Sequence, residues 1–350
     1  MSYFRDNIEA MTGYVPGEQP TDPNVVKLNT NENPYPPSPR VLDALKNLDA
    51  SALRKYPDPS ATEAREAAAE VVGARAEQII CGNGSDELLT MIVRAFVPEG
   101  GLVTFPYPTY SLYEVLADIQ GCRIRAVDEP EDFSLPPAEA LLEGDPQLIL
   151  VNNPNAPTGV FFPKARLGDL ADRASGIVVV DEAYVDFSDA DCLDLARSRP
   201  NVLVLRTLSK SYGLAGLRFG FAVGPEALIA GLMKVKDSYN CSRLAIELAS
   251  AALRDQDYMR ESVEKIRSDR RRLTEALKGR GFAILDSQTN FILATVPGGD
   301  GGKWYLELKK HGVLVRYFDK RRLRDKIRIT IGTPAECDAL IEAVDDIREA

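Results

Sequence analysis

The hydrophobic positions between residues 78 and 224 form short β-rich runs separated by longer stretches with helical spacing. The predicted strands, in chain order, are QIICG, GLVTF, RIRAV, LILVN, IVVVDEA, VLVLRT and FGFAVG. Stretches between them, such as SDELLTMIVRAFV and YSLYEVLADIQ, have the periodicity of amphipathic helices. This alternation predicts an α/β fold with a mostly parallel central sheet sandwiched by helices. The runs LILV and IVVV are apolar throughout, as expected for strands buried on both faces.

The pattern changes after Gly231, where long helical stretches replace the alternation. The strands FAIL, NFILATV, GVLVRYF and KIRITIG then follow, with a final helix from Pro334, and together they predict a smaller α+β domain. We expect an N-terminal arm over residues 1–30 that joins the small domain, a large α/β domain over residues 31–245, and a small C-terminal α+β domain over residues 246–350.

The composition is that of a folded protein that acts on small molecules. Of the 350 residues, 45% are hydrophobic and 27% are charged, which suffices for a sizeable core. The formal net charge of -10 disfavours a nucleic-acid partner, because phosphate backbones attract basic surfaces. No apolar run is long enough to span a bilayer, and the N-terminus lacks the apolar core of a signal peptide. Because the five cysteines are scattered and form no CxxC pair, we expect a cytoplasmic protein.

His311 is the only histidine, which excludes several kinds of catalytic site. A HExxH zinc site needs two histidines, and a Ser-His-Asp triad would have to use this one. The residue lies in ELKKHGV, where a helix is predicted to end at Gly312, so we expect it at a helix terminus on the surface. We therefore expect no metal site, and catalysis through lysine, tyrosine, a carboxylate or a cofactor.

Polar motifs follow several of the predicted strands. They are GNGSDE at 82–87, NNPNAPTG at 152–159, DEAY at 181–184 and TLSK at 207–210. Ligands bind beyond the carboxyl ends of the strands in open parallel sheets, so these motifs are expected to meet at one edge. Each motif alone could be a helix start, a turn or a strand end, but their order and common location indicate a binding site.

An aldehyde cofactor with a pyridine ring and a phosphate would find its partners in these motifs. Lys210 can supply an exchangeable amine, and Asp181 can keep the ring nitrogen protonated. Tyr184 and an asparagine of NNPNAPTG can hydrogen-bond the ring hydroxyl. The phosphate needs a helix N-terminus and a fork-shaped cation. Suitable residues are Gly84, Ser85 and Asp86 at a helix start, with Thr207, Ser209 and Arg218 around the lysine.

The chain resembles the fold-type I pyridoxal phosphate enzymes, and most closely the histidinol-phosphate aminotransferases, through motifs spread over nearly its whole length. These motifs are YVPGEQP, LNTNENPYPPSP, RKYPD, GNGSDE, PYPTY, NAPTG, DEAY, LSKSYGLAGLR, TNFIL, VLVR and IRITIG. The resemblance implies a fold-type I transferase whose large domain binds pyridoxal 5'-phosphate. It also implies a homodimer with shared active sites.

The same resemblance assigns roles to single residues. It implies that Lys210 forms the Schiff base and shuttles the proton, that Asp181 faces the ring nitrogen, and that Tyr184 donates to the ring hydroxyl. Tyr110 of PYPTY would stack on the ring, and Tyr56 of RKYPD would reach the phosphate of the neighbouring subunit's cofactor. The implied phosphate cradle consists of Ser85, Asp86, Ser209 and Arg218.

At the substrate end, the resemblance implies anion contacts from Arg328 of IRITIG and Arg316 of VLVR, with Tyr14 of YVPGE closing the pocket. Two positions depart from the family pattern, and one of them lies in NENPYPPSP, where a Gly is commoner before the second proline. The other is in NAPTG. Relatives commonly have Asn immediately before Pro-Thr-Gly, whereas this chain has Ala156 there. We expect Asn155 to take over the contact with the ring hydroxyl.

The implied function is transamination between L-histidinol phosphate and 2-oxoglutarate, giving imidazole-acetol phosphate and L-glutamate, in L-histidine biosynthesis. An aromatic amino acid aminotransferase would use the same machinery, and a threonine-phosphate decarboxylase of similar fold would release carbon dioxide instead. A cofactor-binding regulator without turnover would need a DNA-binding segment ahead of the arm. We expect no such segment, because the arm begins at residue 1.

Overall fold

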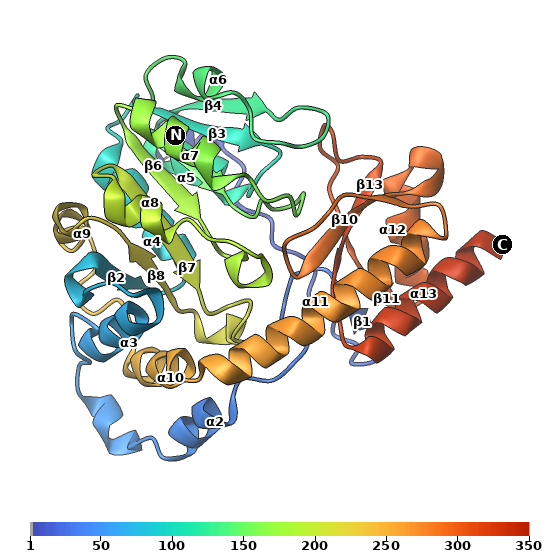
Figure 1. Ribbon diagram of the computed structural model, residues 1–350, viewed down its shortest axis with the longest axis horizontal. Helices are drawn as coiled ribbons and strands as arrows, with labels where there is room; N and C mark the ends of the chain where they lie inside the picture. Colours follow the sequence, from blue (N-terminus) through green and yellow to red (C-terminus); the bar gives the residue numbers. More distant parts are fainter. Residues whose placement is uncertain (1–2, 350) are drawn as a thin grey trace.

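The computed structural model describes residues 3–349, and its largest feature is a seven-stranded sheet of order β2-β8-β7-β6-β5-β3-β4 (Figure 1). Its strands are β2 (Ile79–Gly82), β3 (Leu102–Tyr107), β4 (Arg123–Asp128), β5 (Leu148–Asn152), β6 (Ile177–Asp181), β7 (Val202–Thr207) and β8 (Gly220–Val223). The strands from β7 to β4 are parallel, whereas β8 runs antiparallel to both of its neighbours. The expected mostly parallel sheet is confirmed.

Helices cover both faces of this sheet, because successive residues along a strand point to opposite sides. In β6, Val178 and Val180 pack on one side and Val179 on the other, and all of them are fully buried. The first side carries α2 (Pro39–Lys46), α3 (Thr62–Val72), α6 (Ala138–Leu142), α7 (Lys164–Arg173), α8 (Leu193–Ser198) and α10 (Arg243–Leu253). The second side carries α4 (Ser85–Phe96), α5 (Leu112–Gln120) and α9 (Glu226–Leu232).

The C-terminal part of the chain forms a smaller α+β unit around an antiparallel sheet of order β12-β13-β10-β9. Its elements are β9 (Ala283–Ile284), β10 (Phe291–Thr295), β12 (Arg316–Tyr317), β13 (Lys326–Thr330), α11 (Gln256–Lys278), α12 (Gly301–Lys310) and α13 (Pro334–Glu349). Leu273, Ile292, Ile329 and Leu340 belong to its apolar core. Helix α11 runs from the large unit to this small one (Figure 1).

One predicted strand of the small unit is divided. The structure splits GVLVRYF into β11 (Val313–Leu314) and β12, which belong to different sheets. The first half pairs in parallel with β1 (Val26–Lys27) of the arm, and the second half pairs with β13. The expectation of one continuous strand was wrong because a partner distant in sequence takes the backbone hydrogen bonds of the first half.

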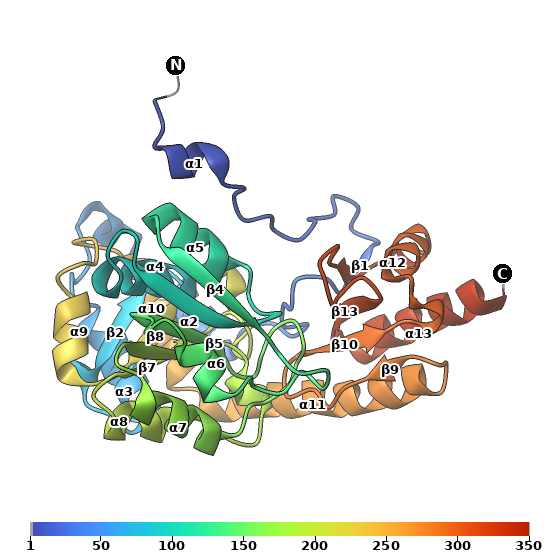
Figure 2. The same cartoon turned by 90° about the horizontal axis from the view of Figure 1, so that it is seen from above.

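The N-terminal arm connects the two units across the top of the molecule in Figure 2. Its short helix α1 (Asp6–Ala10) lies against α5, where Asn7 Nδ2 donates to Asp118 O at 2.7 Å and Arg5 Nη2 donates to Ile119 O at 2.8 Å. Its other end reaches the small unit through the β1–β11 pair. The boundaries at residues 30 and 245 stay predictions, and α10 packs against α2 and α3 of the large unit.

Short 3-10 helices complete the secondary structure: η1 (Ala50–Arg54), η2 (Ala76–Gln78), η3 (Val185–Phe187), η4 (Ala215–Leu217) and η5 (Pro297–Gly299). At the end of α12, the ring of His311 lies beside the carbonyl oxygen of Glu307, with Nδ1 and O 2.9 Å apart. Within residues 3–349, no helix combines the length and apolar character needed to cross a bilayer.

Truncation of a core leucine in the small unit should destabilise the protein strongly. Leu273→Ala removes a fully buried side chain, and we expect a loss of about 2–5 kcal/mol in the free energy of unfolding. Leu306→Ala is the matched control, because Leu306 is 55% exposed and its truncation should change the free energy of unfolding little. Urea denaturation followed by circular dichroism measures both, and equal losses would contradict this assignment of the core.

Candidate active site

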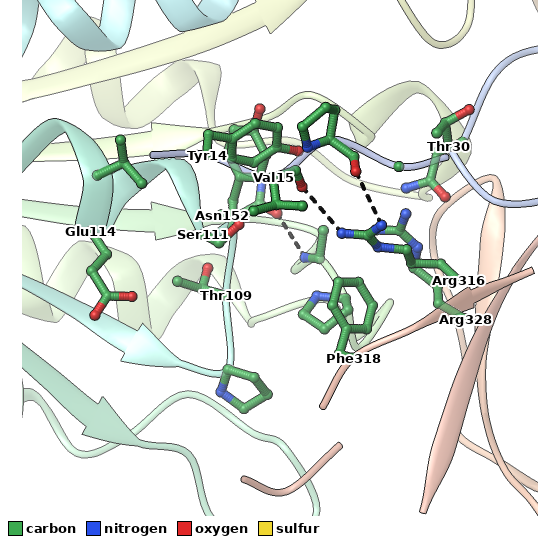
Figure 3. Close-up of a pocket in the computed structure, with 18 of the residues that line it drawn as sticks. Tyr14, Val15, Thr30, Thr109, Ser111, Glu114, Asn152, Arg316, Phe318 and Arg328 are labelled. Carbon is green, nitrogen blue, oxygen red and sulfur yellow. Dashed lines mark hydrogen bonds between the residues drawn. The ribbon is translucent and has the colours of Figure 1, made fainter. Parts of the chain in front are cut away.

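The carboxyl edge of the large sheet borders a cavity of about 1060 Å³, which the arm and the small sheet also line (Figure 3). Most of the residues that the sequence singled out meet there. They are Tyr14, Ser85, Asp86, Tyr110, Asp181, Tyr184, Thr207, Ser209, Lys210, Arg218, Arg316 and Arg328. Gly84, Asn155 and Tyr56 are not part of this lining.

Asp181 ends β6 and is 2% exposed, so its carboxylate depends on hydrogen-bond donors from the protein. One oxygen accepts from the Tyr113 hydroxyl at 2.8 Å, and the other accepts from the backbone N–H of Ala183 at 3.2 Å. Burial raises the pKa of Asp181 to about 6, and the bond from Tyr113 opposes this rise. A carboxylate held in this way can face a protonated ring nitrogen and stay ionised near neutral pH.

Tyr113 is a site residue that the sequence reasoning missed. It lies on α5, is fully buried, and meets the ring of Tyr110 edge to face at 5.7 Å. Tyr110 lines the cavity and donates its hydroxyl to Asp86 Oδ1 at 3.2 Å. The available signal was the spacing in PYPTYSLY, because tyrosines three positions apart in a helical turn point the same way.

Lys210 and Tyr184 lie close together in the cavity wall. The ammonium nitrogen of Lys210 is 5.6 Å from the centre of the Tyr184 ring and 3.5 Å from the carbonyl oxygen of Thr30. The Tyr184 ring packs edge to face on Phe291 at 5.1 Å, which fixes its orientation. An amine and a phenol are thus held side by side at the end of the sheet, next to the carboxylate of Asp181.

The start of α4 offers a site for a phosphate. Gly84 is its N-cap at φ +87, and a Cβ there would lie 2.7 Å from Arg218 Nη2, so glycine admits the guanidinium to the helix start. Arg218 Nη2 donates to Asp86 Oδ2 at 3.0 Å. The hydroxyl oxygens of Thr207 and Ser209 lie 3.0 Å apart in the same cavity wall. A helix N-terminus, a guanidinium and two hydroxyls together suit a phosphate.

Arg316 and Arg328 face each other directly across β12 and β13. Like charges in this position repel, and within residues 3–349 neither guanidinium has a carboxylate partner. Arg316 donates to the carbonyl oxygens of Val15 and Pro16 at 3.2 and 3.3 Å (Figure 3). Arg328 donates to the Asn29 carbonyl, and its buried Nε lacks an acceptor. Burial lowers the pKa of Arg328, and the pair is arranged to receive an anion.

Comparison with known proteins settles the family. Residues 23–344 match the model of the family "Aminotransferase class I and II". The protein belongs to the class I and II aminotransferases.

Proteins similar to this chain carry more specific names. The chain is 46% identical over 347 residues to histidinol-phosphate aminotransferase 1 of Trichormus variabilis, covering 99% of each. It is 45% identical to the histidinol-phosphate aminotransferase of Geobacter sulfurreducens, covering 98% of this chain and 99% of the other. The crystal structure of the Sinorhizobium meliloti enzyme in complex with pyridoxal-5'-phosphate matches with a TM-score of 0.89 and 28% identity over 99% of both chains. The family, the fold class and the pyridoxal phosphate-dependent aminotransferase activity expected from the motifs are confirmed.

The expectation for Asn155 needs correction. The side chain is fully buried outside the cavity lining, and its amide nitrogen donates to Pro108 O, Glu129 Oε1 and Thr158 Oγ1 at 2.9, 3.0 and 3.0 Å. Its oxygen accepts from the Thr109 hydroxyl at 3.0 Å. These bonds hold together the loops after β3, β4 and β5. Asn155 therefore has no free polar atom for a ring hydroxyl.

The residues of this loop that do line the cavity are Asn152 and Ala156. Asn152 Nδ2 donates to Asp181 O at 2.9 Å, and its Oδ1 accepts from the backbone N–H of Ala156 at 2.7 Å. Asn155 is thus committed to the loop structure, whereas Asn152 uses its oxygen and one of the two hydrogens on Nδ2. Tyr184 lines the cavity as well, and its hydroxyl oxygen accepts from Asn31, so its own proton is left to donate to the ring hydroxyl.

Tyr56 lies away from the cavity of its own chain. Its side chain is 78% exposed and stacks on Tyr239, with ring centres 4.5 Å apart. The predicted contact with a neighbouring subunit's cofactor stays a prediction.

Within residues 3–349, no group of three or more His, Cys, Asp or Glu side chains is arranged to hold a metal ion.

Removal of the Tyr113 hydroxyl should weaken cofactor binding. In Tyr113→Phe the pKa of Asp181 rises further, because the bond that opposes the effect of burial is lost. We expect the affinity of the apoprotein for pyridoxal phosphate to fall about tenfold at neutral pH, and the pH below which binding weakens to move upward.

Fluorescence titration of the apoprotein at several pH values measures this change. Tyr212→Phe is the matched control, because Tyr212 is also a shielded tyrosine but its hydroxyl accepts from Gln256 Nε2 instead. Unchanged affinity in Tyr113→Phe across the pH range would contradict the assigned role.

Proposed function

We propose that this aminotransferase transfers the amino group of L-histidinol phosphate to 2-oxoglutarate, giving imidazole-acetol phosphate and L-glutamate, in L-histidine biosynthesis. The observation that carries the proposal is the facing pair Arg316 and Arg328, which lacks a carboxylate partner within residues 3–349. One substrate brings a phosphate to this pair and the other brings a carboxylate, and guanidinium groups bind both anions in bidentate fashion. The names of the similar proteins support the same reaction.

Pyridoxal phosphate, when bound, supplies an aldehyde for the amino group and a ring that withdraws electrons from the substrate's α-carbon. Lys210 would hold the aldehyde end, Asp181 the ring nitrogen and Tyr184 the ring hydroxyl, with Tyr110 against the ring. The phosphate would be held by Gly84, Ser85, Asp86, Thr207, Ser209 and Arg218. The free hydroxyl proton of Tyr184 and the glycine that admits Arg218 to the helix start support this fit.

Lys210 would also move the proton at the α-carbon of the substrate. Its amine follows β7 at the cavity wall, and its hydrogen-bond partner is the Thr30 carbonyl at 3.5 Å, a long contact that is easily given up. A lysine in this position can take a proton from one carbon and return it to another a short distance away. Asp181 would stay anionic opposite the ring nitrogen, because the Tyr113 hydroxyl and the Ala183 backbone N–H donate to its two oxygens.

Aromatic side chains form the wall against which the substrate ring would lie. Tyr14 of the arm meets Tyr110 edge to face, with centres 6.0 Å apart and an interplanar angle of 70°. This wall suits an imidazole ring and a phenyl ring alike. The arginine pair favours histidinol phosphate over an aromatic amino acid, because only the former brings a doubly charged group.

The protein would act as a cytoplasmic homodimer with shared active sites. Leu42, Leu45 and Leu53, which shortly precede Tyr56 in the sequence, are 39%, 49% and 51% exposed. Such a surface suits burial against a second copy, which would bring Tyr56 to the partner's phosphate site. All five cysteines are free, which is consistent with a reducing compartment.

Rapid mixing of the holoprotein with single amino donors, in the absence of a keto acid, tests the proposed substrate. We expect L-histidinol phosphate to bleach the visible band of the bound cofactor much faster than L-phenylalanine does. Faster bleaching by phenylalanine would move the assignment to an aromatic aminotransferase. Release of carbon dioxide from L-threonine phosphate would move it to a decarboxylase.

Neutralisation of the arginine pair should remove the preference for phosphate. We expect Arg316→Gln and Arg328→Gln each to lower kcat/KM for histidinol phosphate by about 10- to 100-fold, because a charge-assisted hydrogen bond is lost. Arg324→Gln is the control, since Arg324 also lines the cavity but pairs with Asp319 at 2.8 Å. Steady-state kinetics measures kcat/KM for each variant. Wild-type values in both Arg316→Gln and Arg328→Gln would contradict the assignment of an anion site to this pair.

A further inference from the structure

Asn31 is a buried residue of the cavity wall that the proposed reaction leaves without a role. It is 1% exposed and lies in NTNEN, between the arm and the large unit. Its backbone adopts φ +56, a left-handed conformation that asparagine and glycine tolerate better than other residues. The Asn290 amide donates to its carbonyl oxygen at 3.0 Å, so the small unit holds the strained position in place.

The donor and acceptor roles in the hydrogen bonds between Thr330, Asn31 and Tyr184 are fixed by the chemistry of the groups. The backbone N–H of Asn31 can only donate, and it donates to Thr330 Oγ1 at 2.9 Å. The Thr330 hydroxyl is therefore free to donate to Asn31 Oδ1 at 3.2 Å. That bond places the oxygen of the amide toward Thr330 and leaves Nδ2, which can only donate, toward Tyr184 OH at 2.9 Å.

The bond from Asn31 determines where the hydroxyl proton of Tyr184 can point. Its oxygen already accepts from Asn31, so the phenolic proton must point elsewhere, and within residues 3–349 it has no acceptor. Tyr184 is 8% exposed and lines the cavity beside Lys210. An unpartnered donor in such a site is costly unless a ligand accepts from it. The loop position that could have shared this task, Ala156, has no polar side chain.

We propose that Asn31 is a positioning residue that sets the polarity of Tyr184, so that the phenol donates its proton to the ring oxygen of the cofactor. Thr330 on β13 orients the Asn31 amide, and the small unit thereby influences a contact made by the large unit. The proposal rests on the proposed role of Tyr184, and the experiment below separates the two.

The pH at which the visible band of the bound cofactor changes is the readout, because a donor to the ring oxygen favours its anion and lowers this midpoint. Asn31→Gly removes the amide while keeping φ positive, and we expect an upward shift. Asn31→Asp gives Tyr184 an acceptor outside the cavity, and we expect a larger upward shift of about one pH unit or more. Thr330→Val should shift the midpoint in the same direction by less than Asn31→Asp.

Two further variants make the test decisive. Tyr184→Phe should itself raise the midpoint, and Asn31→Gly should then add nothing in the Tyr184→Phe background. Asn201→Gly is the control for lost structure, because its amide bonds the carbonyls of Ala171, Ala174 and Gly176, and its midpoint should match the wild type.

A wild-type midpoint in both Asn31 variants, with a shifted midpoint in Tyr184→Phe, would overturn the proposal and leave the role of Tyr184 standing. A wild-type midpoint in Tyr184→Phe would overturn both roles. Neither result depends on the substrate, because no amino donor is present, so the assignment of histidinol phosphate is tested separately.

Discussion

A carboxylate buried at the carboxyl end of the central sheet is the constraint around which this molecule is arranged. Asp181 is 2% exposed, and an ionised group in that position needs donors close by. Tyr113 on α5 provides one and the backbone after β6 provides the other, so α5 must dock at this edge with its tyrosine inward. The same docking brings Tyr110 to the cavity and connects it to Asp86 at the start of α4.

A second constraint is the concentration of positive charge in an acidic protein. The net charge is -10, yet Arg316 and Arg328 lie opposite each other on adjacent strands. Carbonyl oxygens of residues 15, 16 and 29 accept from them, and these dipoles stabilise the guanidinium groups without neutralising them. The two guanidinium groups still repel each other, and an anionic substrate bound between them would relieve this repulsion. The antiparallel register of β12 and β13 keeps the two arginines opposite each other.

The site exists only when the arm and both units are assembled. The segment from Asn29 to Asn33 threads between them, and its residues contact the site one after another. The carbonyl oxygen of Asn29 accepts a hydrogen bond from Arg328, and the carbonyl oxygen of Thr30 accepts one from Lys210. The side-chain amide of Asn33 donates to the carbonyl oxygens of Lys210 and Ser211. Separation of the two units would therefore disturb the substrate end and the cofactor end at once.

The sequence by itself determined the sheet, the layers and the motifs at the strand ends, because apolar periodicity and local turn residues are properties of neighbouring positions. It could not determine where polar side chains point once loops pack. Asn155 turns toward the loop of Glu129, Tyr113 reaches Asp181 from another element, and the arm takes the first half of GVLVRYF as a strand partner. Those outcomes depend on contacts between residues far apart in the chain, and only the tertiary structure decides which of several available donors and acceptors meet.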